Sequence, residues 1–343
     1  MPDLKIKISD LYKIFGANGA AHVDKVRNGV GKTELLEKHG HVLGLQNINI
    51  DIFAGRIQVI MGLSGSGKST LIRHINRLIE PTTGEIMIDG KDVLSMSDAE
   101  LLHFRRFDAS MVFQKFALLP HRTVLANTTY GLSMQGVEQS EAEKRASHWL
   151  ERVGLGGFED RFPAQLSGGM QQRVALARCL INDPDLILMD EPLGALDALT
   201  REKMQSLVLK IWKETGKTII LITHSVEEAL LLGERLYVMA PRPGRIHKEY
   251  NLPFASMGLK QDLREIKKNK DLVFDFITYP NPTNGMFSID LGHSRNSVSA
   301  TITDLVGRKI HKETFENRQY LDFILDEPKG IYFVILEMKN NKS

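Results

Sequence analysis

Residues 62–69 read Gly62-Leu63-Ser64-Gly65-Ser66-Gly67-Lys68-Ser69. This octapeptide matches the pattern G-x-x-x-x-G-K-[ST] at every fixed position. A short apolar run at residues 56–61 precedes it, as a buried strand would, and apolar residues at helical spacing follow it as far as residue 79. Strand, glycine-rich loop and helix in this order form the setting in which the pattern binds phosphate. The stretch therefore predicts a phosphate-binding loop.

Each residue type in the loop has a physical role. Glycines let backbone N–H groups turn inward around phosphate oxygens, and the helix that follows directs its N-terminal dipole at the same oxygens. Lys68 should reach the β- and γ-phosphates, and the Ser69 hydroxyl should bind Mg²⁺. The residues expected to contact the nucleotide here are Gly62, Ser64, Gly65, Ser66, Gly67, Lys68, Ser69 and Thr70.

The composition is that of an ordinary globular protein. The chain has 343 residues, of which 42% are hydrophobic and 25% are charged, and this length suits about two domains. The net charge of +2 gives no argument for bulk nucleic-acid binding, so we expect no nucleic-acid partner. The single cysteine, Cys179, fits a reducing compartment.

Neither a signal peptide nor a membrane-spanning helix is expected. Charged residues interrupt the N-terminal stretch where a signal peptide needs an apolar core. No run approaches the ~20 apolar residues of a membrane-spanning helix. If the protein works at a membrane, another chain must cross it.

The residues before the loop predict strands that are separated by an insertion. Residues 4–15 and 45–53 alternate as strands do, and residues 17–44 between them predict two short helices. We expect Phe15 to stack on adenine, with Tyr12 as the second choice. A purely structural role for both aromatic residues is the alternative.

The insertion also contains a second glycine- and lysine-containing segment, residues 29–33. A phosphate-binding loop would need a glycine at position 26, which is Val26, and would need a strand before it. We interpret this segment as a connection between two helices.

A predominantly helical region follows a strand that ends at Gln114. Ser167 is a suitable N-cap for a later helix, and Gly168 and Gly169 beside it make a helix N-terminus that can accept an anion. The helices expected after Gln114 span residues 124–134 and 141–153, and one at residues 98–106 is expected before that strand.

Two carboxylates follow an apolar strand at residues 185–189. In phosphate-loop ATPases the first of them, here Asp190, holds Mg²⁺. Glu191 lies one residue further on, where it could polarise a water molecule as a general base. A later buried strand, residues 218–223, places His224 at its end, where we expect it near the γ-phosphate.

As an ordered set, these motifs resemble the ATP-binding subunit of ABC transporters over residues 4–255. The residues that carry the resemblance are 62–69, Gln114, 166–173, 186–191, 194–197 and His224. The resemblance implies an ABC-type ATPase with an α/β phosphate-loop core. It places this domain at residues 1–270, with a helical subdomain at about residues 115–165. ATP and Mg²⁺ are the ligands that it implies.

In that family two subunits enclose two ATP molecules, so the resemblance implies a homodimer. Ser167, Gly168 and Gly169 of one subunit then face the γ-phosphate held by Lys68 of the other, and Asp197 contacts the opposite subunit. The further nucleotide contacts that it implies are Gln114, Ser167, Gly168, Gly169, Gln171, Asp190 and Asp197. The implied metal ligands are Ser69, Gln114 and Asp190, and the implied catalytic residues are Lys68, Glu191 and His224.

The same resemblance implies partners and a location. Transmembrane permease subunits dock on the helical subdomain, and a solute-binding protein acts indirectly. The chain is then a peripheral protein at the cytoplasmic face of the inner membrane. A soluble ABC-type ATPase of DNA repair or translation is disfavoured, because those proteins carry a long coiled-coil insertion or two cassettes in one chain.

Two groups of importers share features with the sequence. The stretches 11–16, 35–40, 61–83 and 116–121 resemble importers of glycine betaine, proline or choline. The stretches 190–201 and 240–246 resemble importers of taurine, sulfonate or nitrate. We expect a quaternary amine osmolyte as the solute, with taurine, sulfonate or nitrate as the alternative.

After about residue 271 the pattern changes to short strands. They are expected at residues 286–291, 298–303, 308–315, 320–325 and 330–338, and predict a small β-sandwich at residues 271–343. The stretches 279–285, 302–308 and 328–333 resemble the C-terminal sorting domain of type IX secretion. This tail is interpreted as a join of unrelated coding sequence, a cytosolic accessory domain, or a sorting signal that would direct a secreted or cell-surface protein.

Overall fold

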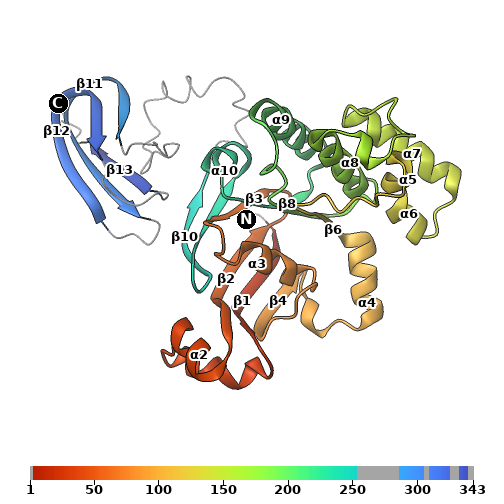
Figure 1. Ribbon diagram of the computed structural model, residues 1–343, viewed down its shortest axis with the longest axis horizontal. Helices are drawn as coiled ribbons and strands as arrows, with labels where there is room; N and C mark the ends of the chain where they lie inside the picture. Colours follow the sequence, from red (N-terminus) through yellow and green to blue (C-terminus); the bar gives the residue numbers. More distant parts are fainter. Residues whose placement is uncertain (1–2, 253–285, 305–308, 325–331, 339–343) are drawn as a thin grey trace. The chain divides into compact units, whose positions relative to one another are not determined.

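The computed structural model describes residues 3–252, 286–304, 309–324 and 332–338 (Figure 1). The chain divides into two compact units, residues 1–258 and 259–343, and each is described by itself. The predicted boundary near residue 270 and the sorting-domain-like stretch 279–285 lie outside the described residues. Within the described part of the chain, no helix is both long and apolar enough to span a membrane.

The first unit begins with a four-stranded antiparallel sheet in the order β2-β1-β4-β5. Its strands are β1 (Leu4–Phe15), β2 (Val42–Phe53), β4 (Thr83–Ile88) and β5 (Lys91–Asp92). Both β1 and β2 alternate buried and exposed residues over much of their length, because one face of the sheet covers the core. The two long strands expected before the loop are therefore confirmed.

The insertion between β1 and β2 is short and helical, as predicted. It contains the turn η1 (Gly19–His22) and the helices α1 (Val23–Arg27) and α2 (Lys32–His39). Residues 28–31 connect the two helices, so the second glycine- and lysine-containing segment is a helix connection and not a phosphate loop.

A second sheet has six strands in the order β10-β9-β3-β8-β7-β6. These are β3 (Ile57–Gly62), β6 (Ala109–Val112), β7 (Leu186–Asp190), β8 (Thr218–Thr223), β9 (Arg235–Ala240) and β10 (Arg245–Asn251). All neighbours are parallel except β9 and β10. Every residue of β3, β7 and β8 is buried, which explains their continuous apolar sequences. The three carboxyl ends therefore meet at one edge of the sheet.

One hydrophobic core joins the two sheets through helix α3 (Lys68–Ile75). Ile6 and Ile48 of the first sheet share this core with Leu188 and Ile222 of the second. Leu71, Ile72 and Ile75 of α3 are fully buried in it. The helix that follows the glycine loop is thus fixed between the sheets, and its first residue cannot shift without disturbing the core.

The helical subdomain is built around a separate small core. Its helices are α5 (Val124–Thr128), α6 (Tyr130–Met134), α7 (Gln139–Arg152) and α8 (Gly168–Leu180). They lie together in Figure 1, and α4 (Asp98–His103) precedes them in the chain. Val124, Leu150 and Val174 belong to the buried cluster that they share.

The prediction of one helix at residues 124–134 was wrong. The structure has two helices there, α5 and α6, which meet at Thr129. The hydroxyls of Thr128 and Thr129 donate to the carbonyls of Val124 and Leu125, four residues earlier. Such bonds compete with the backbone and bend a helix, which the spacing of apolar residues alone did not indicate.

The second unit is an antiparallel sheet in the order β12-β11-β13. Its strands are β11 (Met286–Asp304), β12 (Lys309–Ile324) and β13 (Tyr332–Met338). Buried Val298, Ala300 and Ile302 lie at every second position of β11, and Leu321 and Phe323 of β12 are buried too. In the described residues of the tail, the all-β prediction is confirmed, but the five predicted strands form three. A register shift between the pairs of Asp290 and Arg295 keeps β11 continuous where the sequence suggested a break.

His74 of α3 should make the stability of the first unit depend on pH. The ring is fully buried, Nδ1 lies 2.7 Å from the Ile79 carbonyl oxygen, and no residue that the structure describes forms a hydrogen bond with Nε2. Burial lowers the pKa of His74 to about 4 from 6.5. Above pH 6.5 neither state binds the proton. As the pH falls from 6.5 toward 4, the unfolded chain gains a proton that the folded chain does not, so stability is lost.

Between pH 7 and pH 4.5, we expect the free energy of unfolding of the parent to decrease by about 2–3 kcal/mol more than that of His74→Gln. The glutamine amide does not titrate and can still donate to the Ile79 carbonyl. Urea denaturation at the two pH values measures both losses. Equal losses in parent and variant would show that His74 does not carry this dependence.

Candidate nucleotide-binding site

The glycine loop connects β3 to α3 through a tight turn. Gly65 and Gly67 have φ angles of +76° and +89°, a region that favours glycine. A Cβ at Gly62 would lie 2.7 Å from Ser66 Oγ and 2.8 Å from the Met239 carbonyl oxygen, so only glycine fits there. Within the described residues, the buried Ser66 hydroxyl has no hydrogen-bond partner. A closely folded loop with an unused hydroxyl fits the binding of phosphate oxygens.

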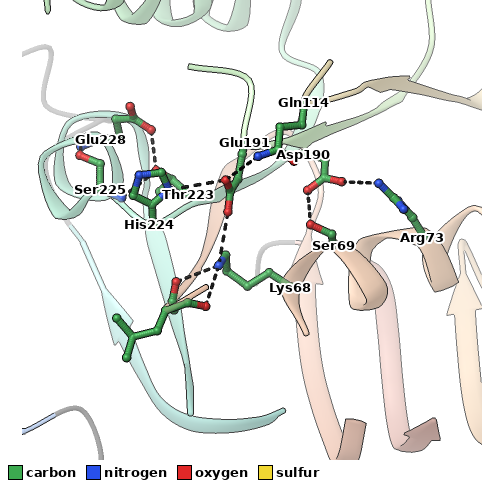
Figure 2. A network of polar contacts seen from close by, with 12 residues as sticks. Lys68, Ser69, Arg73, Gln114, Asp190, Glu191, Thr223, His224, Ser225 and Glu228 are labelled. Carbon is green, nitrogen blue, oxygen red and sulfur yellow. Dashed lines mark hydrogen bonds and ion pairs between the residues drawn. The ribbon is translucent and has the colours of Figure 1, made fainter. Parts of the chain in front are cut away.

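Lys68 lies beneath this loop and is 4% exposed. Its Nζ donates to the carbonyl oxygens of Gly62 and Leu63, at 2.8 and 3.1 Å. The same nitrogen lies 3.4 Å from Glu191 Oε1 (Figure 2). The loop therefore holds the ammonium group at the place where a bound phosphate would need a positive charge.

Ser69 and Asp190 form a pair of oxygen ligands at the end of β7. The Ser69 hydroxyl donates to Asp190 Oδ1 at 2.7 Å, and Arg73 Nη2 donates to Oδ2 at 3.1 Å (Figure 2). Asp190 is fully buried. Mg²⁺ commonly binds through one or two protein oxygens together with water and substrate phosphates. The pair fits such an ion, although the described residues contain no group of three or more His, Cys, Asp or Glu side chains that could hold a metal.

Glu191 receives three contacts from separate segments of the chain. Besides Lys68, Gln114 Nε2 donates to its Oε2 at 3.1 Å, and His224 Nδ1 lies 3.5 Å from the same oxygen (Figure 2). Its backbone has a φ of +47°, and its N–H donates to the Ile222 carbonyl of β8 at 3.1 Å. A positive φ in a residue other than glycine is costly and persists where the surroundings impose it. The backbone thus orients this carboxylate toward Lys68.

The second set of predicted nucleotide contacts lies outside this cluster. Ser167 caps α8 by accepting from Met170 N, and Asp197 caps α9 (Ala198–Thr215) by accepting from Thr200 N. Gln171 donates to the carbonyls of Pro163 and Leu166. In the described part of the chain, none of these three side chains bonds to Lys68 or Glu191.

The remaining predicted contacts are at the margin of the site. Phe15 is 41% exposed, and its ring lies against Gly44, where a Cβ would be 2.7 Å from Phe15 Cε2. Tyr12 is buried in the core, so of the two aromatic residues Phe15 alone has a substantially exposed ring. Ser64 and Gly65 are exposed on the loop, and Thr70 is half-buried in α3.

Arg73 is not among the predicted site residues, although it lies four residues after Ser69, on the same face of α3. Glu228, which accepts a hydrogen bond from Thr223 beside His224, is not among them either (Figure 2). Its position four residues after His224 was the available signal.

Comparison with known families gives two matches. Residues 45–194 match the family described as ABC transporter. Residues 278–343 match the secretion system C-terminal sorting domain.

Individual proteins resemble more than two thirds of this chain. A taurine import ATP-binding protein from Pelagibacter ubique is 60% identical over 232 residues, which are 68% of this chain and 84% of that protein. A glycine betaine transport ATP-binding protein from Bacillus subtilis is 52% identical over 236 residues, 69% of this chain and 56% of that protein. A dimeric ATP-binding cassette, solved in a post-hydrolysis state with ADP and phosphate, has a TM-score of 0.61 at 35% identity and covers 72% of this chain and 98% of its own.

Proposed function

Because this chain belongs to the ATP-binding proteins of ABC transporters, we propose that its ATPase activity powers an importer. The observation that carries the proposal is the convergence on Glu191. Lys68, Gln114 and His224 come from distant segments, and all three contact its carboxylate. A carboxylate held beside a phosphate-loop lysine is the arrangement that ATP hydrolysis needs.

The roles of the residues follow from their positions. Lys68 would bind the phosphates, and Ser69 with Asp190 would hold Mg²⁺, which supplies positive charge at the phosphate oxygens. Arg73 keeps one oxygen of Asp190 occupied and leaves the other to Ser69. Glu191 would accept a proton from the attacking water. Gln114 and His224 orient its Oε2 from two sides.

We further propose that the chain acts as a homodimer. Among the described residues, nothing lies within 4 Å of a Cβ added at Gly168, and the Ser167 hydroxyl beside it is bonded to Met170 N rather than to a residue of the Lys68 cluster. A helix N-terminus binds anions, so a second copy could place Ser167, Gly168 and Gly169 on the γ-phosphate. Asp197 would contact the opposite subunit. The related cassette solved with ADP and phosphate is a dimer.

The partners we propose are permease subunits and, through them, a solute-binding protein. The chain would then lie at the cytoplasmic face of the inner membrane. For the solute, we propose taurine or a related sulfonate. The taurine relatives share more identity with this chain than the glycine betaine relatives do, and the match covers more of their length. The expectation of a quaternary amine is therefore less well supported.

Uptake of labelled solutes tests the choice. We expect cells that lack this chain to lose uptake of labelled taurine and to keep uptake of labelled glycine betaine. Reintroducing the parent gene should restore taurine uptake, whereas the Lys68→Ala gene should not. Loss of glycine betaine uptake with taurine uptake intact would reverse the assignment.

The match at residues 278–343 favours a second candidate, a surface or secreted protein sorted by its tail. The intact mass of the native protein in fractionated cells separates the two candidates. A full-length mass in the inner-membrane fraction supports the importer ATPase with its tail as a passenger. A full-length mass outside the cell supports the second candidate.

A further inference from the structure

Two turns flank Glu191, and both are tied to the same pair of charged side chains. One turn spans residues 193–196, and the other, residues 223–225, carries His224. Gly194 N donates to the Glu191 carbonyl oxygen at 3.3 Å, and a Cβ at Gly194 would lie 3.6 Å from His224 Cε1. The two turns therefore lie close to each other and to the candidate general base.

Glu228 of α10 (Val226–Leu232) holds the turn with the histidine. Its carboxylate is 5% exposed, and Oε2 accepts from the Thr223 hydroxyl at 2.5 Å (Figure 2). Thr223 Oγ1 in turn accepts from Ser225 N at 2.9 Å, and Ser225 Oγ accepts from Glu228 N at 3.3 Å. These bonds fix the backbone on both sides of His224.

Arg201, in the first turn of α9, holds the other turn. Its Nη2 donates to the Leu196 carbonyl at 2.7 Å, and its Nε donates to the Leu193 carbonyl at 3.4 Å. Nε also lies 3.6 Å from Glu228 Oε1. Burial raises the pKa of the Glu228 carboxyl, and the charge of Arg201 counteracts that rise. The cation therefore helps to keep a buried carboxylate ionised.

We propose that Arg201 and Glu228 are a positioning pair, which holds the 193–196 turn and His224 in a fixed arrangement around Glu191. The inference rests on the proposed ATPase function. Neither residue touches the reacting atoms, so the pair acts through the geometry of Glu191 and His224. Breaking it should slow the chemical step and leave nucleotide binding nearly intact, because Lys68 and the glycine loop are not part of the pair.

The test compares Glu228→Gln, Arg201→Met and the double variant of the full-length chain, using steady-state ATP hydrolysis. We expect kcat to fall about 10-fold in each single variant, since small misplacements of catalytic groups have large costs. KM should change by less than about 3-fold. The double variant should be no slower than the slower single variant, because each single substitution already removes the contact between Arg201 and Glu228. Arg201→Lys keeps the charge but loses the forked donors of the guanidinium group. Its kcat should lie between those of the parent and Arg201→Met.

Glu214→Gln is the matched control, because Glu214 lies in the last turn of α9, the helix that carries Arg201, and pairs with Arg152. We expect the kcat and KM of Glu214→Gln to equal those of the parent. Three results would overturn the positioning role. They are a parental kcat in Glu228→Gln, additive losses of kcat in the double variant, or changes confined to KM. If Glu228→Gln does not fold, Arg201→Met, whose side chain is partly exposed, carries the same comparison. An inactive parent would refute the proposed function itself, and this inference with it.

Discussion

Lys68→Ala should abolish tight binding of ATP by the full-length chain. The Lys68 ammonium is the cation held beneath the glycine loop, and it already binds two loop carbonyls and faces Glu191. Hydrogen bonds from a charged donor contribute about 1.5–3 kcal/mol each. The loss of two such bonds to phosphate corresponds to at least about a 100-fold weaker Kd. Equilibrium titration with a fluorescent ATP analogue measures it.

Lys217→Ala is the matched control for this variant. Lys217 is also largely buried and pairs with Asp183 at 2.9 Å, but it has no contact with the loop in the described structure. We expect its ATP affinity to equal that of the parent. Lys68→Arg keeps the positive charge but changes its position. It therefore distinguishes the effect of the charge from the effect of where the ammonium group lies. Undiminished affinity in Lys68→Ala would remove the glycine loop from the nucleotide site.

Glu191→Gln should stop hydrolysis and leave nucleotide binding intact. The amide has nearly the shape of the carboxylate but cannot accept a proton from water, and general-base catalysis contributes about 10²–10⁴-fold to rate. We therefore expect kcat to fall by about 100-fold or more. The substitution also removes the anion that pairs with Lys68, so ATP affinity should not fall. The ATP-bound dimer should accumulate, and size-exclusion chromatography with MgATP measures it.

The control for this substitution is Glu227→Gln, an exposed position on α10 three residues after His224. Its hydrolysis rate should match that of the parent. Hydrolysis at the parent rate in Glu191→Gln would show that Glu191 is not the base. A monomer that binds MgATP without dimerising would instead contradict the proposed homodimer.

Local sequence signals predicted the elements that form the site. Glycine spacing located the loop, because positive φ angles and close backbone contacts require glycine at those positions. Continuous apolar runs located β3, β7 and β8, because strands buried on both faces have no polar side. The predictions were weaker where the signal was periodicity alone. One helix was predicted where threonine hydroxyls separate two, and five strands were predicted where the described part of the tail has three.

By itself, the sequence determined that this chain has a phosphate loop, two carboxylates after a buried strand and a histidine at the end of another. Only the tertiary structure decided which of these residues meet. The strand order β3-β8-β7 places residues 62, 190 and 223 at one edge, because parallel strands align their carboxyl ends. Arg73 and Asp190 are far apart in the sequence, as are Arg201 and Glu228, and each side chain has several possible partners. Packing of α3 and α10 against the sheet, and of α9 against α10, selects one of these partners.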